Sequence, residues 1–221
     1  MGGDFSFGRR GACLAMLTGW LASWVVLAGS TAQSQQPART ANTTARPRAA
    51  AGGAAATPQT PPVLLSASFA KECRVAVGDA FPTIELPALG EAAEPAGLDR
   101  FAGKQATVVL FWSPESWMSR VAVRDFALDL APTAAANGLG VVGIAVGPDA
   151  EAIQAVADTA EARFPQLHDA DGAALGQVGV SRMPRVYVLD AERNIVWFDV
   201  EYSETTRREL RQTLEALAGQ R

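Results

Sequence analysis

Residues 107–120 read Thr-Val-Val-Leu-Phe-Trp-Ser-Pro-Glu-Ser-Trp-Met-Ser-Arg, and this stretch decides the fold. Its first six residues are apolar or β-branched, which is typical of a strand that is buried on both faces of a sheet. Ser113-Pro114 ends that strand. A helix is predicted from about Trp117 to Ala131, because apolar residues recur there every four positions. The predicted buried face consists of Met118, Ala122, Phe126 and Leu130.

The chain beyond this helix continues as an α/β domain. The further predicted elements are a buried strand at 139–146, a helix at 150–162, a short helix at 173–178, strands at 185–189 and 195–200, and a helix at 204–218. The first strands alternate with helices, so they need right-handed crossovers and run parallel. The last two strands are close enough in sequence for an antiparallel hairpin. The predicted fold class is α/β, with a mixed central sheet and helices on both faces.

The region before residue 107 predicts an N-terminal strand extension. Cys73, Val75 and Val77 alternate with polar or small residues, which predicts an opening strand. A turn follows at 78–82, and a short extended piece follows at 84–86.

The N-terminus reads as a targeting segment. Arg9 and Arg10 precede an uncharged apolar stretch at 11–28, and Ser30-Thr31-Ala32 has the small residues of a signal-peptidase site. Residues 1–32 are therefore predicted to be a signal peptide. An uncleaved N-terminal anchor is the alternative, although the apolar stretch is slightly short of the ~20 residues that span a bilayer.

A linker separates this segment from the globular domain. Residues 33–62 are rich in Ala, Pro and Thr and have no periodic apolar face, so they are predicted to be disordered. The domain is predicted at 63–221. The protein is expected to be exported to the periplasm or a similar extracytoplasmic space, with membrane contact only through an uncleaved anchor.

Charge and residue counts exclude several functions. The chain has 19 Lys and Arg residues against 23 Asp and Glu residues, a net charge of −4, which argues against a nucleic-acid partner. A single histidine, His168, excludes a site built from several histidines, and no residues have zinc-ligand spacing. We expect no metal and no cofactor.

Five short stretches in order resemble exported TlpA-like redoxins of the thioredoxin-like superfamily. They are Val77-Gly78-Asp79-Ala80-Phe81-Pro82 with Ile84-Glu85-Leu86, the strand from Val108 to Trp112, Phe164-Pro165-Gln166-Leu167 with Asp169-Ala170-Asp171-Gly172, Gly179-Val180-Ser181-Arg182-Met183-Pro184, and the strand from Arg185 to Asp190. The resemblance spans about residues 75–218 and implies a thioredoxin-like fold. It also implies that Pro184 follows a cis peptide bond. The spacing typical of peroxiredoxins would instead place the reactive thiol at Val121. Valine has no thiol, so the chain does not match the peroxiredoxin pattern.

The same resemblance places the family's two redox cysteines at Ser116 and Ser119. A cysteine at a helix N-terminus reacts as a thiolate, whereas a serine hydroxyl is far too weak an acid to replace it and cannot form a disulfide. Ser116 could serve as a nucleophile only beside an oriented base, for which Glu115 and His168 are the candidates. We favour the interpretation that Ser116 caps the helix.

Large side chains surround these two positions. The resemblance implies a groove that lays a substrate backbone alongside the residue before the proline, and the residues assigned to it are Trp117, Met118, Met183 and Pro184. Their apolar side chains predict either a binding patch or, for Met118 and Trp117, an extension of the core.

Cys73 is the thiol that remains after removal of residues 1–32. A buried, inert cysteine is the favoured interpretation, and a disulfide to a partner is the alternative. The function expected from the sequence is a redox-inactive binding or assembly module of the cell envelope, with an envelope protein or peptide as its partner. One alternative is a thiol-disulfide oxidoreductase that works through Cys73 or a partner's thiols. A structural domain without a ligand is another.

Overall fold

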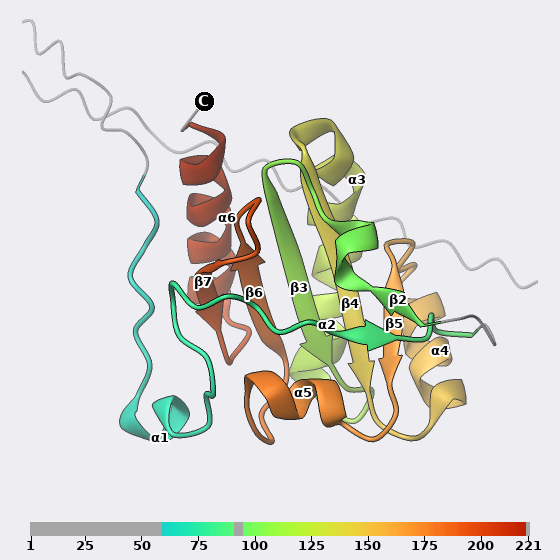
Figure 1. Ribbon diagram of the computed structural model, residues 1–221. Coiled ribbons are helices and arrows are strands. Elements are labelled where there is room, and N and C mark those ends of the chain that lie inside the picture. The colour runs from blue at the N-terminus through green and yellow to red at the C-terminus, as the bar shows by residue number, and fades with distance from the viewer. Residues whose placement is uncertain (1–58, 91–94, 220–221) are drawn as a thin grey trace, which may run out of the picture. The chain divides into compact units, whose positions relative to one another are not determined.

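The computed structural model describes residues 59–90 and 95–219. These residues form a five-stranded sheet with helices on both of its faces and a small two-stranded sheet (Figure 1). None of the helices in the described ranges is long and apolar enough to cross a membrane. The predicted targeting segment at 1–32 lies outside these ranges, as does all of the predicted linker except residues 59–62.

The larger sheet has the strand order β5-β4-β3-β6-β7. In chain order the elements are α1 (Ala67–Ala70), β1 (Glu85–Leu86), β2 (Ala96–Gly97), the 3₁₀ turn η1 (Leu98–Phe101), β3 (Ala106–Trp112), α2 (Trp117–Asp125), the π-helical turn η2 (Phe126–Leu130), α3 (Ala131–Ala134), the 3₁₀ turn η3 (Ala135–Asn137), β4 (Leu139–Val146), α4 (Ala150–Thr159), β5 (Gln166–Asp169), α5 (Ala173–Val178), β6 (Arg185–Leu189), β7 (Ile195–Asp199) and α6 (Glu204–Ala218). The β3–β4 and β4–β5 pairs are parallel, whereas β3–β6 and β6–β7 are antiparallel. The predicted α/β class with a mixed sheet is therefore confirmed.

Strand β3 lies at the centre of the sheet and is buried along its whole length. Val108, Leu110 and Trp112 pack into a core that includes residues of α2, α3, α4 and α6. Val109 and Phe111 point to the opposite face, where the core is completed by α5 and the segment before β3. This alternation explains why residues 107–112 carry no polar side chain on either face except that of Thr107, since both faces are covered.

The helix predicted after β3 begins at Trp117, as expected, but it is not regular throughout. Helix α2 ends at Asp125, and a π-helical turn leads into α3. Pro132 lies in the first turn of α3 and has no N–H group to donate, which is consistent with a break in the regular hydrogen-bond pattern just before it. Of the residues predicted for the buried face, Ala122 and Phe126 are fully buried, while Met118 and Leu130 are partly buried.

The opening strand predicted at 73–77 is wrong. Cys73 makes only an isolated bridge to Gly179, and the residues after it belong to no strand. Val77 is half exposed, so the alternating pattern does not reflect a buried face. The strands of the N-terminal extension are instead β1 and β2, which pair with each other in antiparallel register.

Strand β5 is not among the strands predicted above. It pairs in parallel with β4 at the sheet edge, and its burial alternates between half-buried and buried residues. Gln166, His168 and Asp169 give it a polar composition that is not typical of a strand in sequence. Gln166 and His168 lie on the half-buried face, whereas Asp169 is fully buried and its carboxylate accepts hydrogen bonds from the backbone N–H groups of Ala174 and Leu175.

Candidate functional site

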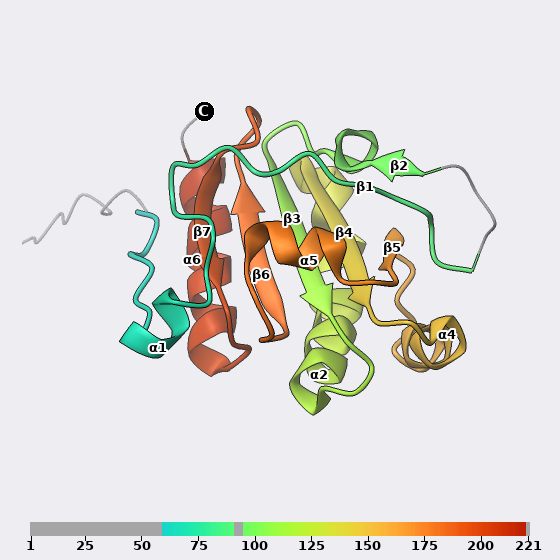
Figure 2. The ribbon, with the colours of Figure 1, turned by 60° about the horizontal axis from the view of Figure 1, so that its bottom comes forward.

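The segment that leaves β3 and the segment that enters β6 meet at one end of the sheet. Strands β3 and β6 are antiparallel, with Phe111 opposite Arg185, so the end of one lies beside the start of the other. Residues 179–184, called here the cis-proline loop, arrive at this end, and residues 113–116 leave from it. Both segments lie along the same edge in Figure 2, beside the start of α2. The predicted redox positions and groove residues all belong to these loops and to the first turn of α2.

Ser116 is the N-cap of α2, as predicted. Its backbone is extended, and its Oγ accepts a hydrogen bond of 3.3 Å from the backbone N–H of Ser119. The same hydroxyl donates a hydrogen bond of 3.3 Å to the backbone carbonyl of Met183. Ser116 therefore joins the helix to the cis-proline loop, using its acceptor for one contact and its proton for the other.

Ser119 lies one helical turn further on and is fully buried. Its Oγ has no hydrogen-bond partner among the described residues. A buried hydroxyl without a basic neighbour has no group to take its proton, and hence no route to a nucleophilic alkoxide. The two serines are thus one helical turn apart, as the resemblance implied, but neither hydroxyl is hydrogen-bonded to a carboxylate or an imidazole among the described residues.

Neither candidate base forms a hydrogen bond with the Ser116 hydroxyl, whose partners are the Met183 carbonyl and the Ser119 N–H. Glu115 is exposed and forms no hydrogen bond with the part of the chain that the structure describes. His168 lies on β5, which β4 separates from β3, and its Nε2 lies 2.8 Å from the carbonyl oxygen of Gly147. This arrangement supports the capping role of Ser116.

The four groove residues differ in exposure. Trp117 is 65% exposed and stands clear of the core, whereas Met118 and Met183 are partly buried and Pro184 is buried. The Met183–Pro184 peptide bond is cis, as the resemblance implied. Met183 packs against the core on the α5 side of the sheet. The side chain available to a partner is above all the indole of Trp117.

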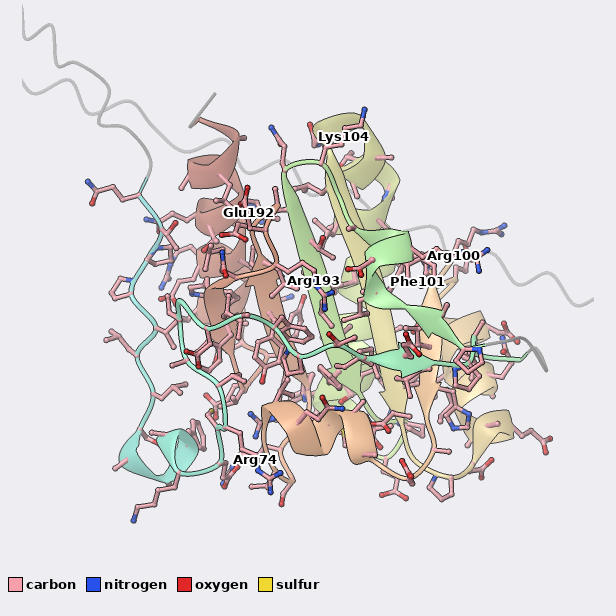
Figure 3. The ribbon with its side chains drawn as sticks, viewed as in Figure 1. Arg74, Arg100, Phe101, Lys104, Glu192 and Arg193 are labelled. Atoms are coloured by element: carbon pink, nitrogen blue, oxygen red, sulfur yellow. The ribbon has the colours of Figure 1, made fainter. Side chains whose placement is uncertain are left out.

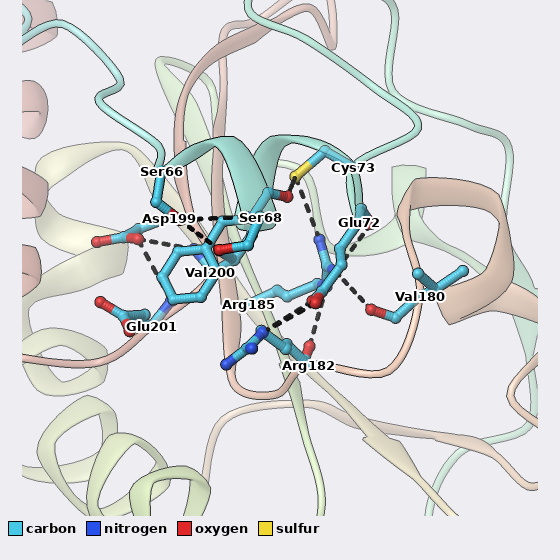
Figure 4. A network of polar contacts seen from close by, with 11 residues as sticks. Ser66, Ser68, Glu72, Cys73, Val180, Arg182, Arg185, Asp199, Val200 and Glu201 are labelled. Carbon is cyan, nitrogen blue, oxygen red and sulfur yellow. Dashed lines mark hydrogen bonds and ion pairs between the residues drawn. The ribbon is translucent and has the colours of Figure 1, made fainter.

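A second cluster lies against the cis-proline loop, and sequence reasoning identified only part of it. Arg185 is fully buried, and its guanidinium donates to three carbonyls, those of Glu72, Val180 and Arg182, at 2.8–3.0 Å (Figure 4). Its Nη1 lies 3.6 Å from the sulfur of Cys73. The Cys73 thiol also donates to the Phe69 carbonyl at 3.4 Å. A charged residue that opens an apolar strand was the available sequence signal for Arg185.

The segment 72–74, called here the N-terminal clamp, holds the cis-proline loop from this side. The backbone N–H of Val180 donates to the Glu72 carbonyl at 2.9 Å, and that of Arg74 donates to the Val178 carbonyl at 3.0 Å. Glu72 also forms an ion pair of 2.9 Å with Arg182. The side chain of Arg74, labelled beside α5 in Figure 3, donates to the Gly176 carbonyl.

Arg185 and the Glu72 backbone leave no room for a side chain at Gly179. A Cβ atom added to Gly179 would lie 2.5 Å from Nη1 of Arg185 and 2.6 Å from the Glu72 carbonyl oxygen. Glycine is needed at this position because the guanidinium passes directly over the backbone. Cys73 itself is only partly buried, so the prediction of a buried cysteine is half right.

Tyr187 follows Arg185 on the same face of β6 and is also fully buried. Burial raises the pKa of its hydroxyl to about 12, while the Arg185 charge and N–H groups lower it and Cys73 raises it further. The hydroxyl nevertheless has no partner with ordinary hydrogen-bond geometry within the described ranges. Tyr187, Arg185 and Cys73 therefore influence one another's charges, and the Tyr187 hydroxyl is a hydrogen-bond donor without an acceptor in the described residues.

The strand order, the capped helix after the central strand and the cis-proline loop beside that cap together define the thioredoxin-like class of proteins. The sequence profile described as Redoxin matches residues 76–217, and the chain belongs to the Redoxin family. No curated protein sequence matches the chain.

Solved structures share this fold. One is a Chlorobium tepidum protein with the proposed assignment of thiol:disulfide interchange protein DsbE, with 19% identity, a TM-score of 0.58, and coverage of 65% of this chain and 99% of that one. Another is the thioredoxin domain of a thiol-disulfide oxidoreductase from Bacteroides vulgatus, with 17% identity, a TM-score of 0.54, and coverage of 63% and 99%. A third is the peroxidoxin BcpB from Mycobacterium tuberculosis, with 22% identity, a TM-score of 0.54, and coverage of 66% and 97%. The predicted thioredoxin-like fold is therefore confirmed.

Proposed function

We propose that this Redoxin-family chain is an exported, redox-inactive module of the cell envelope that binds an extended segment of a protein or peptide. The observation that carries the proposal is the state of Ser116. It stands where the resemblance places the attacking cysteine, and its hydroxyl is engaged with the helix N-terminus and the Met183 carbonyl. A group committed to two structural contacts serves as a connection and not as a nucleophile.

The loss of redox chemistry follows from the two side chains together. Disulfide exchange needs a thiolate to attack and a second thiol to release the product. Ser116 and Ser119 supply neither, and the buried Ser119 has no partner in the described residues that could activate it. The reductase reaction of the family is therefore lost and not merely slowed.

The binding role is supported by what remains at the same place. Trp117 presents an indole to solvent at the mouth of the predicted groove, and an exposed tryptophan is a typical anchor of a binding surface. The cis-proline loop beside it keeps its position through the contacts of Ser116 and the N-terminal clamp. Export is supported by the sequence of residues 1–32 alone.

Redox inactivity is tested by insulin reduction in the presence of dithiothreitol. We expect the rate with this protein to equal the rate without protein. Clear acceleration that persists in the Cys73→Ser variant would contradict the proposal, because it would require chemistry at the serines.

Binding is tested with an unfolded peptide that cannot exchange disulfides, the insulin B chain with alkylated cysteines. We expect saturable binding that is unaffected by reductant and at least tenfold weaker in Trp117→Ala. Leu128→Ala is the matched control, because Leu128 is 58% exposed but lies on the π-helical turn away from the groove. Equal weakening in both variants, or none in Trp117→Ala, would contradict a groove at Trp117.

A thiol-disulfide oxidoreductase working through Cys73 is the second candidate. The partial exposure of the Cys73 thiol is the observation that favours it. A mixed disulfide between Cys73 and a partner, trapped from the envelope and released by reductant, would support this candidate over the binding module.

A further inference from the structure

The guanidinium of Arg185 is a buried positive charge without a carboxylate partner among the described residues. Its hydrogen bonds go to three neutral carbonyls, and its remaining side-chain neighbour is the sulfur of Cys73 (Figure 4). Burying a charge is costly unless an opposite charge or equivalent hydrogen bonding offsets it. This cluster would therefore be stabilised by an anion at the position of Cys73.

Tyr187 is an independent observation that points to the same position. Its hydroxyl is fully buried and has no hydrogen-bond partner in the described part of the chain. Tyr187 lies two residues after Arg185 on β6, on the face against which Cys73 packs. A buried hydroxyl without an acceptor and a buried cation without a carboxylate partner among the described residues thus lie on the face of the sheet against which the partly buried Cys73 packs.

We propose that Cys73 is a site of oxidation by peroxides, at which the sulfur is retained as a sulfinate anion held by Arg185 and Tyr187. The site is separate from the groove, and the proposal does not depend on the proposed function. Cys73 is only partly buried, which is the condition for a small peroxide to approach this residue. The oxidised sulfur supplies the negative charge and the acceptor oxygens that the cluster lacks.

The reaction takes two equivalents of peroxide. The sulfur attacks one oxygen of hydrogen peroxide, the O–O bond breaks, and the other oxygen leaves as water with the thiol proton, giving a sulfenic acid. A second peroxide molecule oxidises this sulfur in the same way, again with loss of water, to the sulfinic acid, which ionises. The sulfur is oxidised twice, and two peroxide molecules are reduced to water.

The direct experiment treats the full chain, carrying Cys13→Ser, with hydrogen peroxide. The chain has two cysteines, so this variant leaves Cys73 as its only thiol. We expect peptide mass spectrometry to find two added oxygen atoms on Cys73 and the melting temperature to rise by at least about 2 °C. Absence of oxidation in the folded protein, a disulfide-linked dimer in its place, or a lower melting temperature would overturn the proposal.

Two substitutions separate the role of charge from that of packing. Arg185→Lys keeps the charge, whereas Arg185→Gln keeps a donor and removes the charge. We expect oxidation to raise the melting temperature in the first and to lower it in the second. An equal shift in both would overturn the ion pair. Should neither variant fold, Tyr187→Phe tests the same site, since it removes only an unpartnered hydroxyl; its oxidation shift should be smaller than that of the wild type, and an unchanged shift counts against the proposal.

A matched pair of variants removes the need for peroxide. Cys73→Asp places a carboxylate beside Arg185, and Cys73→Asn places a neutral side chain of the same shape there. We expect the aspartate variant to melt at least about 2 °C above the asparagine variant. Equal melting temperatures, or the reverse order, would show that an anion at position 73 does not stabilise the fold.

Discussion

The two sides of the cis-proline loop offer opposite chemical environments. On one side, Ser116 and Ser119 are neutral, and Ser116 is fully used by the fold. On the other side, Cys73 lies 3.6 Å from a buried guanidinium and on the same face as the unpartnered hydroxyl of Tyr187. In the proposed function, the position at which the resemblance places the family's first redox cysteine serves as a structural contact. The thiol lies where the family resemblance assigns no function.

This difference shows that reactivity depends on the surroundings of a side chain as much as on its place in a family pattern. Ser116 keeps the helix N-terminus that would favour a thiolate, but it has no thiol to use it. Cys73 has the thiol and a neighbouring charge, but it lies on no helix N-terminus. The variants below add thiols at the helix N-terminus, remove the charge of Arg185, or remove a single hydroxyl group.

The largest expected effect is a gain of activity. Replacing both Ser116 and Ser119 with cysteine puts a thiol at the N-cap and a second one helical turn on, within reach of a disulfide. We expect insulin reduction to rise from background to clear turnover, although Glu115 beside the first thiol disfavours its thiolate and slows the reaction. Ser116→Cys alone is the control, since it lacks the releasing thiol. A double variant that folds but forms no internal disulfide would mean that these serines do not occupy the redox positions.

Removing the charge behind the loop should have the largest effect on stability. Arg185→Met leaves the carbonyls of Glu72, Val180 and Arg182 without their donor in a buried site. We expect the free energy of unfolding to fall by about 3 kcal/mol or more, at roughly 1–3 kcal/mol for each buried group left unpaired. Urea denaturation measures this loss. A loss below about 1 kcal/mol would show that water or a rearranged backbone replaces the guanidinium.

In the unoxidised protein, Tyr187→Phe should change the pH dependence of stability only at alkaline pH. The pKa of Tyr187 is raised from 10.0 to about 12 by burial, so folding favours the protonated hydroxyl. That contribution is complete below pH 10 and is lost as the pH rises from 10 through 12. Relative to the variant, the wild type should lose about 2–3 kcal/mol of stability over this range, at ~1.4 kcal/mol for each pKa unit. Parallel stability curves for the two proteins above pH 10 would contradict this burial effect.

The smallest effect distinguishes the two serines. Ser116→Ala removes the N-cap and the contact with Met183, so we expect a loss of about 1 kcal/mol. Ser119→Ala removes a buried hydroxyl that has no partner among the described residues, and it should leave stability unchanged or slightly higher. Denaturation of both variants under the same conditions provides the comparison. A larger loss for Ser119→Ala than for Ser116→Ala would reverse these assignments.

Much of the fold could be predicted because its strongest signals are local. The apolar run at 107–112 and the helical spacing after Trp117 need only neighbouring residues to be recognised. Ser116 was predicted as a cap from its place between the two. The cis bond at Met183 could be expected only from the family resemblance.

The remainder depends on contacts between distant residues. Cys73 and Arg185 are 112 positions apart, and no local pattern brings them together. The alternation from Cys73 to Val77 has the pattern of a strand, but in this segment the backbone forms only the isolated bridge between Cys73 and Gly179. The polar composition of β5 gives no strand signal, because Gln166 and His168 lie on its half-buried face and the buried Asp169 is paired with backbone N–H groups of α5.

The end of helix α6 has a practical consequence for how the protein can be attached to a surface. Its last turn lies at the end of the sheet where β3 begins, whereas Trp117 lies just beyond the end where β3 finishes (Figure 1). A sensor chip that captures the protein through this last turn should therefore leave the indole facing the flowing solution. Capture through lysine chemistry would be less uniform, because Lys71 lies next to the N-terminal clamp and Lys104 lies just before β3. The orientation of the molecule on the chip can thus be chosen in advance, with the groove or the opposite end presented to a dissolved partner.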